Sequence, residues 1–281
     1  MPMFSAFDGT GLAYHESGAG RVLVCVPGGP LQASVYLGDL GGLSAHRRLV
    51  RLDLRGTGDS AVPVDPGSYR CDRLVDDVEA LRAELGVERV DLLGHSAGGN
   101  VAVRYVQRHP GRVDRLVLVT PSVFGVGIEV DPQVRLATAA LRAGEPWFSP
   151  AYAALTAMLA GDPPPDARDL VTPFWYGRWD DRARAFAAAE DGQRNNAAVP
   201  YFLADGAFDP AGTRAALAAF GRPVLVLAGQ VDVNSPPPAL AGYAALFPDA
   251  RLVVQAGAGH FPWLDDPAGF AAAVEAFLGQ K

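Results

Sequence analysis

The chain has little cysteine, no long apolar run and no excess of basic residues. Its two cysteines among 281 residues exclude a disulfide-rich secreted scaffold, and Cys25 and Cys71 lack the spacing of metal ligands. No apolar stretch approaches 18 residues, so no segment is expected to span a bilayer. The net charge of −7 argues against nucleic acid and anionic membranes as partners, because both attract clustered Lys and Arg.

The first residues do not have the basic and then apolar pattern of a secretory signal, so we expect a cytoplasmic protein. About half of the residues (49%) are apolar. That is enough for one large α/β domain with an insertion, or for two small domains. No internal repeat or low-complexity segment is present.

Short runs rich in β-branched residues predict buried strands, and amphipathic patterns between them predict helices. The strand-like runs are residues 22–26, 49–54, 90–93, 116–119, 224–228 and 252–254. The helical patterns are 72–85, 100–108, 239–246 and 268–278. This alternation predicts a mostly parallel sheet with helices on both faces. Residues 4–7 and 12–16, around an Asp-Gly turn, predict an antiparallel hairpin at the sheet edge, which makes eight strands.

The interval from 121 to 222 lacks a convincing strand and contains helix-like segments at 133–143 and 180–189. A structureless loop of that length is improbable in a compact domain. We therefore expect a helical cap inserted after the sixth strand of the core. The predicted division is a core of residues 1–122 and 210–281, with a cap or lid of residues 123–209.

A G-H-S-A-G pattern at residues 94–98 lies between the strand-like run 90–93 and the helical pattern 100–108. In this strand–turn–helix arrangement the turn is so tight that its flanking positions take only glycine. The central residue, Ser96, then projects its hydroxyl above the sheet, near a helix N-terminus. The pattern predicts a nucleophilic serine.

A serine hydroxyl is a poor nucleophile at neutral pH and needs a base, which in turn needs an orienting acid. Of five histidines, His260 follows the last strand-like run within a segment of small residues. Asp232 follows the preceding run, 224–228. The chain order Ser96, Asp232, His260 predicts a catalytic triad, with Asp209 as the other candidate for the acid.

Acyl transfer also needs donors for the oxyanion that forms on the substrate carbonyl. One predicted donor is the N–H of Ala97, the residue after the nucleophile. The other is the N–H of Gly29, in the Pro-Gly-Gly-Pro segment 27–30 that follows the third strand-like run. Such a reaction requires no metal and no cofactor.

These residues resemble the α/β-hydrolase superfamily over nearly the whole chain. More narrowly, the chain resembles proline iminopeptidase-like serine hydrolases. Residues 27–30 are similar to that group's H-G-G-P-G loop, and residues 53–60 are similar to its D-x-R-G-x-G-x-S segment. The resemblance implies that residues 53–60 form a structural loop, with Arg55 and Asp59 in a buried ionic or hydrogen-bonded network.

Three departures from that group affect the expected specificity. Pro27 replaces the histidine of the loop, and Leu31 replaces its final glycine. Ala198 stands where a cap glutamate of true proline iminopeptidases would hold the free amine of the substrate. Other acids of the cap remain as candidates for that role. They are Glu190, Asp191, Asp205 and Asp209.

We therefore expect a serine hydrolase that cleaves an ester or amide bond of a small, largely apolar substrate. Glu190, Trp175 and Tyr201 of the cap are the candidate substrate contacts. One alternative is an aminopeptidase of the proline iminopeptidase type acting on a short peptide, and others are an esterase, lactonase or thioesterase. A hydrolase-fold sensor of small molecules is the alternative from a different class.

Overall fold

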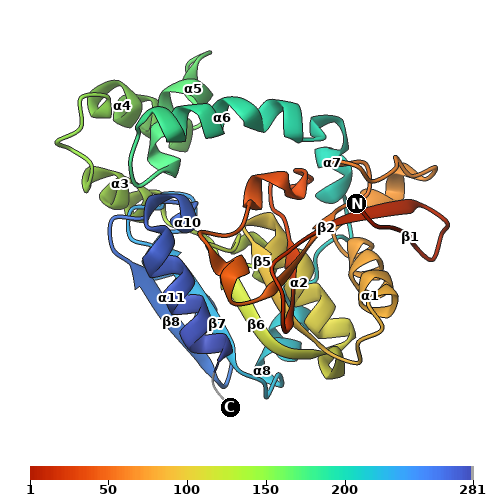
Figure 1. The fold of residues 1–281 in the computed structure, drawn as a ribbon. Helices are drawn as coiled ribbons and strands as arrows, with labels where there is room; N and C mark the ends of the chain where they lie inside the picture. The colour runs from red at the N-terminus through yellow and green to blue at the C-terminus, as the bar shows by residue number, and fades with distance from the viewer. Residues whose placement is uncertain (280–281) are drawn as a thin grey trace.

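The computed structural model describes residues 1–279 and contains one eight-stranded sheet in the order β1-β2-β4-β3-β5-β6-β7-β8 (Figure 1). The strands are β1 (Met3–Ser5), β2 (Gly11–Ser17), β3 (Val22–Val26), β4 (Arg48–Asp53), β5 (Val90–His95), β6 (Val113–Val119), β7 (Val224–Gly229) and β8 (Ala250–Gln255). β1 and β2 form an antiparallel hairpin, β2 is antiparallel to β4, and the remaining neighbours are parallel. The predicted fold class is confirmed.

The helices lie on both faces of the sheet and beyond its carboxyl edge. They are α1 (Leu74–Glu84), α2 (Ala97–Arg108), α3 (Pro132–Ala140), α4 (Phe148–Leu159), α5 (Ala167–Val171), α6 (Asp181–Gln193), α7 (Val199–Phe202), α8 (Pro210–Ala218), α9 (Pro237–Ala244), α10 (Pro262–Asp265) and α11 (Pro267–Leu278). The four helical patterns predicted between the strands correspond to α1, α2, α9 and α11.

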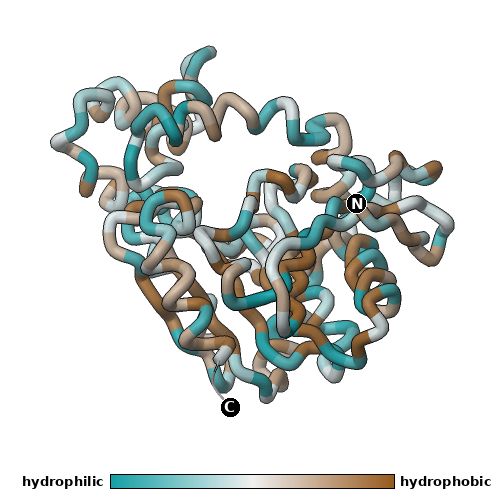
Figure 2. The backbone as a smooth tube through the Cα atoms, in the orientation of Figure 1, coloured by the Kyte–Doolittle hydropathy of each residue, from teal (hydrophilic) through white to brown (hydrophobic). Residues whose placement is uncertain are grey.

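Strand β3 shows why a central strand can be apolar at every position. Leu23 and Cys25 belong to the apolar cluster that includes residues of α11. Val24 and Val26 belong to the cluster on the opposite face, with residues of α1 and α2. Because successive side chains of a strand point to opposite faces, a sheet covered on both sides needs apolar residues throughout. Figure 2 shows this as hydrophobic colour along the sheet and on the adjacent helices.

The parallel register brings four loops to one edge of the sheet. Val26 pairs with Gly94, His95 pairs with Val119, and Gly229 pairs with Gln255. The strands β3, β5, β7 and β8 therefore end at a common edge. The loops that follow them carry the residues that the sequence singled out.

Between β6 and β7 the described chain contributes no strand to the sheet, as predicted. In Figure 1 the helices α3 to α6 lie above the carboxyl edge of the sheet. Helices α3, α4 and α5 contribute Ala139, Leu155 and Val171 to an apolar cluster that also includes Val233 of the core. Helix α6 instead contributes Ala183 to the cluster that contains residues of α11. Helix α8 instead packs against α2 of the core. The boundaries of the cap at 123 and 209 stay a prediction.

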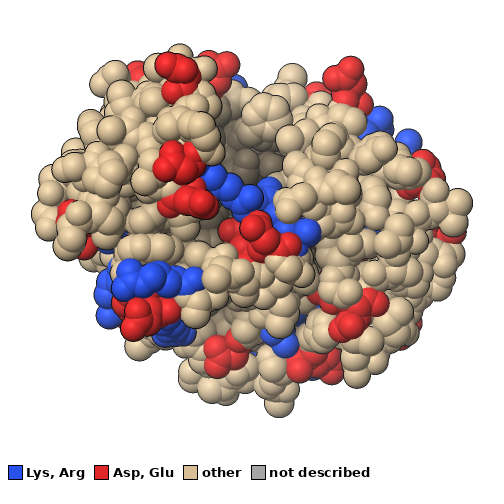
Figure 3. Space-filling view, turned by 90° about the horizontal axis from the view of Figure 1, so that it is seen from above, with Lys and Arg blue, Asp and Glu red and all other residues tan. Residues whose placement is uncertain are grey.

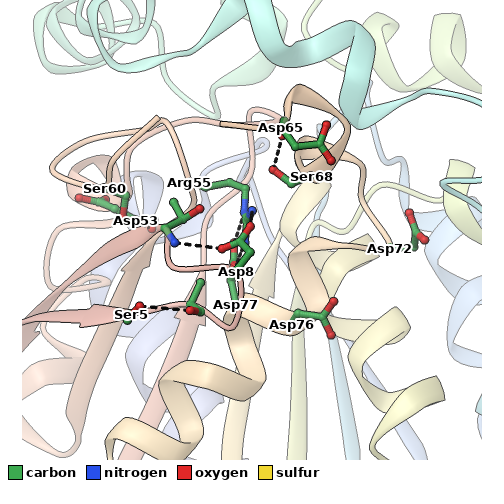
Figure 4. Close-up of polar contacts among 12 residues, drawn as sticks. Ser5, Asp8, Asp53, Arg55, Ser60, Asp65, Ser68, Asp72, Asp76 and Asp77 are labelled. Atoms are coloured by element: carbon green, nitrogen blue, oxygen red, sulfur yellow. Dashed lines mark hydrogen bonds and ion pairs between the residues drawn. The ribbon is translucent and has the colours of Figure 1, made fainter. Parts of the chain in front are cut away.

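The segment 53–60 contains a buried ionic network, but its members differ from the expectation. Arg55 is buried and donates from Nε to Asp77 (2.9 Å) and from Nη1 to Asp8 (2.6 Å). Figure 4 shows its side chain directed toward these two carboxylates. The prediction was wrong for Asp59, whose side chain is 53% exposed because the turn after β4 directs it to solvent. Asp53 is the buried carboxylate of the segment.

Both cysteines are buried and free. Burial raises the pKa of the Cys25 thiol to about 12, which makes it an inert core residue. Within residues 1–279, no helix combines the length and the apolar character needed to cross a membrane.

Candidate active site

Ser96 occupies the sharp turn between β5 and α2, with a backbone φ of 52°. This left-handed conformation is rare for residues other than glycine, and it is found at sites where the surroundings impose it. Those surroundings are crowded on both sides of the serine. A Cβ atom at Gly94 would lie 2.7 Å from the carbonyl oxygen of Gly98, and one at Gly98 would lie 2.4 Å from the carbonyl oxygen of Pro27. The glycines of the motif are thus required by close backbone approach.

The structure brings the side chains of Ser96, His260 and Asp232 together from three separate loops. His260 Nε2 lies 2.9 Å from Ser96 Oγ, and His260 Nδ1 lies 2.8 Å from Asp232 Oδ2. Both the imidazole and the carboxylate are buried. With Nδ1–H donating to the carboxylate, Nε2 is left as the acceptor for the serine hydroxyl. Such an arrangement can remove a proton from that hydroxyl.

The loop after β7 holds the Asp232 carboxylate in place. Its Oδ1 accepts from the N–H of Asn234 (2.8 Å) and from the N–H of Ser235 (3.2 Å). The other candidate acid, Asp209, accepts from the N–H of Gly212 at the N-terminus of α8 and therefore serves as a helix cap. The geometry favours Asp232 as the partner of His260.

The two predicted oxyanion donors lie next to Ser96. Gly29 borders the same cavity as Ser96 and has a φ of +112°. The N–H of its neighbour Gly28 already donates to the hydroxyl of Tyr36 at 2.6 Å. Ala97 begins helix α2, where the first N–H groups have no acceptor within the helix. These positions fit donors for an anionic oxygen formed at Ser96.

A buried polar chain behind the site was not predicted from the sequence. The Tyr36 hydroxyl lies 2.7 Å from His95 Nδ1, and His95 Nε2 lies 3.0 Å from the carbonyl oxygen of His260. Burial, and the nearby His260, lower the pKa of His95 well below its usual range, so this imidazole is neutral. The chain runs from the Gly28 N–H through Tyr36 and His95 to the backbone of His260.

A cavity of about 210 Å³ opens at Ser96 and His260, between the core and the cap. Figure 3 shows a hollow on this side of the molecule, with basic and acidic side chains along its border. Its apolar wall includes Met158, Val171, Trp175 and Phe261. The Trp175 ring meets the His260 imidazole edge-on, and the Trp175 carbonyl accepts from the main-chain N–H of His260 at 2.7 Å.

Two of the three predicted substrate contacts border this cavity. Trp175 and Glu190 do, whereas Tyr201 does not. The side chain of Tyr201 is 44% exposed, and its ring lies against that of Tyr69. An aromatic residue in a cap can cover either the cavity or the outer surface, and its position in the sequence does not distinguish the two. A substrate contact of Tyr201 therefore stays a prediction.

The cavity also has a charged wall, of which the sequence indicated only one member. Glu190 lies 3.2 Å from Nη1 of Arg194 and 3.9 Å from Nη2 of Arg168. Both arginines border the cavity. Asp191 binds Arg168 at 2.9 Å and is itself largely exposed. The expected cavity was largely apolar, whereas the observed one is apolar on one side and ionic on another.

One group in the described part of the chain has the composition of a metal site. His15 Nε2 lies 2.9 Å from Asp53 Oδ2 and 3.5 Å from Asp59 Oδ2. The Asp53 carboxylate already accepts from the N–H of Ser34 and from the N–H of Asp59. Its bonds within the protein account for this cluster, which does not border the cavity.

Comparison with known proteins places the fold in a family. The family model described as the alpha/beta hydrolase fold matches residues 21–267. N-formylmaleamate deformylase of Pseudomonas putida is 30% identical over 93% of this chain and 90% of its own length. An uncharacterised protein of Mycobacterium tuberculosis is also 30% identical, over 98% of this chain and 80% of its own length.

Among solved structures, the esterase RhEst1 from Rhodococcus sp. ECU1013 aligns over 99% of this chain and 98% of its own, with a TM-score of 0.71 and 27% identity. A proline iminopeptidase of Heyndrickxia coagulans is 31% identical, but over only 38% of this chain and 38% of its own. The resemblance to proline iminopeptidases is therefore partial. The family model covers most of the sequence, and the chain belongs to the α/β-hydrolase fold family.

Proposed function

We propose that this protein is a serine hydrolase that cleaves an ester or amide bond of a small substrate through an acyl-enzyme. The observation that carries the proposal is the hydrogen-bonded chain of Ser96, His260 and Asp232 at the floor of a cavity between core and cap. A strained serine at a strand–helix turn, with a buried His–Asp pair behind it, is the arrangement that activates a hydroxyl for attack on a carbonyl.

In the first half of the reaction, His260 Nε2 takes the proton of Ser96 as Oγ attacks the carbonyl carbon. The N–H groups of Gly29 and Ala97 hold the resulting oxyanion. His260 then returns the proton to the leaving alcohol or amine. In the second half, a water molecule attacks the acyl-serine with His260 again as the base, and the acid product leaves. Asp232 fixes the tautomer of the imidazole and stabilises its charged form.

The relatives support hydrolysis of an acyl bond. Two proteins that align over more than nine-tenths of this chain are named as an esterase and as a deformylase. An aminopeptidase is less well supported, since the matching stretch of the proline iminopeptidase covers 38% of this chain. Of the four cap acids considered as amine anchors, Glu190 is the one that borders the cavity. Its carboxylate is already shared between Arg194 and Arg168.

A fluorophosphonate probe and a panel of 4-nitrophenyl esters and amino-acid anilides test the proposal on wild type and on Ser96→Ala. We expect covalent labelling of wild type only, and a fall in ester turnover on the order of 10³-fold or more in the variant. Labelling or turnover that persists in Ser96→Ala would overturn the proposal. A single turnover followed by retention of the product would favour the small-molecule sensor instead.

A further inference from the structure

We propose that the substrate carries a carboxylate group, which Arg194 binds in the cavity together with Arg168. This inference deepens the proposed function and rests on it. The candidate occupants are esters or amides that bear one free carboxylate, for example half esters of short dicarboxylic acids.

The first observation is where the backbone holds Arg194. The N–H of Ala33 donates to the Gln193 carbonyl (2.8 Å), and the N–H of Asn195 donates to the Leu31 carbonyl (2.9 Å). Arg194 therefore pairs with Gln32 in a short antiparallel bridge, and Gln32 belongs to the loop that also contains Gly29. Such a bridge fixes the cap segment against the proposed oxyanion loop, on the border of the cavity that also contains Ser96.

The second observation concerns the donors of the Arg194 side chain. Nε donates to the Pro30 carbonyl (3.3 Å) and Nη1 donates to Glu190 (3.2 Å). Nη2 has no hydrogen-bond acceptor among residues 1–279, and the side chain is 19% exposed. A guanidinium is held in a fixed plane by its existing bonds, so its free edge is ready for a planar anion such as a carboxylate.

The third observation is the charge of the cavity wall. Its ionised side chains are Arg168, Arg194 and Glu190. Arg168 also pairs with the exposed Asp191 at 2.9 Å, so among the described residues Arg194 has only its share of the Glu190 carboxylate as counter-charge. Burial lowers the pKa of the Arg194 guanidinium, although Glu190 acts in the opposite direction. A monoanion would compensate this partly buried positive charge. An ammonium group at Glu190 would instead approach two guanidinium groups, which disfavours a free amine.

The test compares esters of similar length whose terminal group is anionic, neutral or cationic. In the acyl series these are the 4-nitrophenyl half ester of glutaric acid, 4-nitrophenyl valerate and 4-nitrophenyl 5-aminovalerate. In the leaving-group series, 3-carboxyphenyl butyrate is compared with phenyl butyrate. We expect wild type to prefer the carboxylate in at least one series, by about tenfold or more in kcat/KM. The series that shows the preference identifies the side of the scissile bond on which the carboxylate lies.

Three variants assign the preference to residues. In Arg194→Gln, the ratio of kcat/KM for the anionic ester to that for the neutral ester should fall by about tenfold or more. In Arg184→Gln the ratio should not change, because that arginine lies on the exposed side of α6 beside Asp181. Glu190→Gln should raise the ratio, since it frees Arg194. A role of Glu190 as an amine anchor predicts instead that this variant lowers the ratio of kcat/KM for the ammonium ester to that for the neutral ester.

Equal rates on anionic and neutral esters in both series, or a preference for the ammonium ester, would overturn the inference while leaving the serine hydrolase intact. Failure of the proposed function has a different signature, namely turnover that Ser96→Ala does not abolish. Calorimetric binding of monomethyl glutarate and of methyl valerate to Ser96→Ala measures the charge preference without turnover. Equal affinity for the two ligands would also overturn it.

Discussion

His95 and His260 are joined by a hydrogen bond from Nε2 of the first to the main-chain carbonyl of the second, at 3.0 Å. The hydroxyl of Thr120 donates to the same carbonyl at 2.8 Å. The His95 side chain thus acts on the site through the main chain of His260, and it does not contact Ser96 Oγ. Its other nitrogen faces the Tyr36 hydroxyl, which accepts from the N–H of Gly28. The loop with the proposed base and the loop with a proposed oxyanion donor are therefore positioned by one buried chain.

Tyr36→Phe tests that positioning role. The change leaves the Gly28 N–H and His95 Nδ1 without their hydrogen-bond partner. The loop of Gly28 and the loop of His260 are then held less firmly in position. We expect kcat for ester hydrolysis to fall on the order of tenfold with little change in KM. The matched control is Tyr243→Phe, because the buried Tyr243 hydroxyl has no hydrogen-bond partner within residues 1–279 and lies outside the cavity. A rise in KM alone, or an equal effect in the control, would contradict the role.

The neutral state of His95 predicts a pH dependence of stability. Its pKa in the folded protein lies well below 6.5, so below about pH 6.5 the unfolded chain binds a proton that the folded protein does not. The free energy of unfolding should therefore decrease as the pH falls below that value, by up to about 1.4 kcal/mol per pH unit from this group. Urea denaturation between pH 5 and pH 8 should show a shallower slope for His95→Gln than for wild type. Parallel slopes would show that His95 is not buried as a neutral imidazole.

Much of the site could be predicted because parallel strands end at one edge of the sheet. Each of Ser96, Asp232 and His260 follows a strand whose apolar pattern is visible in the sequence, so chain order translated into spatial proximity. The close approach of Gly94 and Gly98 likewise follows from the tight turn that the pattern implies. Local sequence and global topology agree at these positions.

The contributions of the cap could not be predicted in the same way. Arg194 faces the cavity because its backbone pairs with the loop that contains Leu31, a contact between residues far apart in the chain with no pattern of its own. Tyr201 lies on the outer surface for an equally non-local reason, its packing on Tyr69. Helical periodicity identifies the helices of an insertion, but it does not say which ends of them face the core.

The strained backbone of Ser96 predicts a gain of stability when the strain is removed. Glycine adopts a φ of 52° without the steric cost that other residues have there. Ser96→Gly should therefore be more stable than Ser96→Ala by about 1 kcal/mol, although both lose the hydroxyl. Thermal denaturation of the two variants measures the difference. The alanine variant is the control, and equal midpoints would mean that this turn stores no strain.

Asp232→Asn separates the two candidate acids. The change keeps the shape of the side chain but removes the charge that holds Nδ1–H of His260, so kcat should fall on the order of 10³-fold or more. Asp209→Asn is the comparison, because an N-cap at α8 accepts asparagine with little loss. Its kcat should stay within about twofold of wild type. The reverse pattern would assign the acid to Asp209.

The buried ion pair of Arg55 and Asp77 predicts a large effect on stability that its exposed neighbour does not share. Arg55→Met leaves the fully buried carboxylate of Asp77 uncompensated, which should lower the free energy of unfolding by about 3–5 kcal/mol. Asp59→Asn should change it by less than about 0.5 kcal/mol, because its side chain faces solvent. Chemical denaturation of both variants at pH 7 provides the measurement. The kcat of folded Arg55→Met for ester hydrolysis should stay near that of wild type, since Arg55 does not border the cavity at Ser96. Two equally small losses of stability would show that the 53–60 loop does not depend on this pair, and a selective loss of kcat would give Arg55 a role in the site.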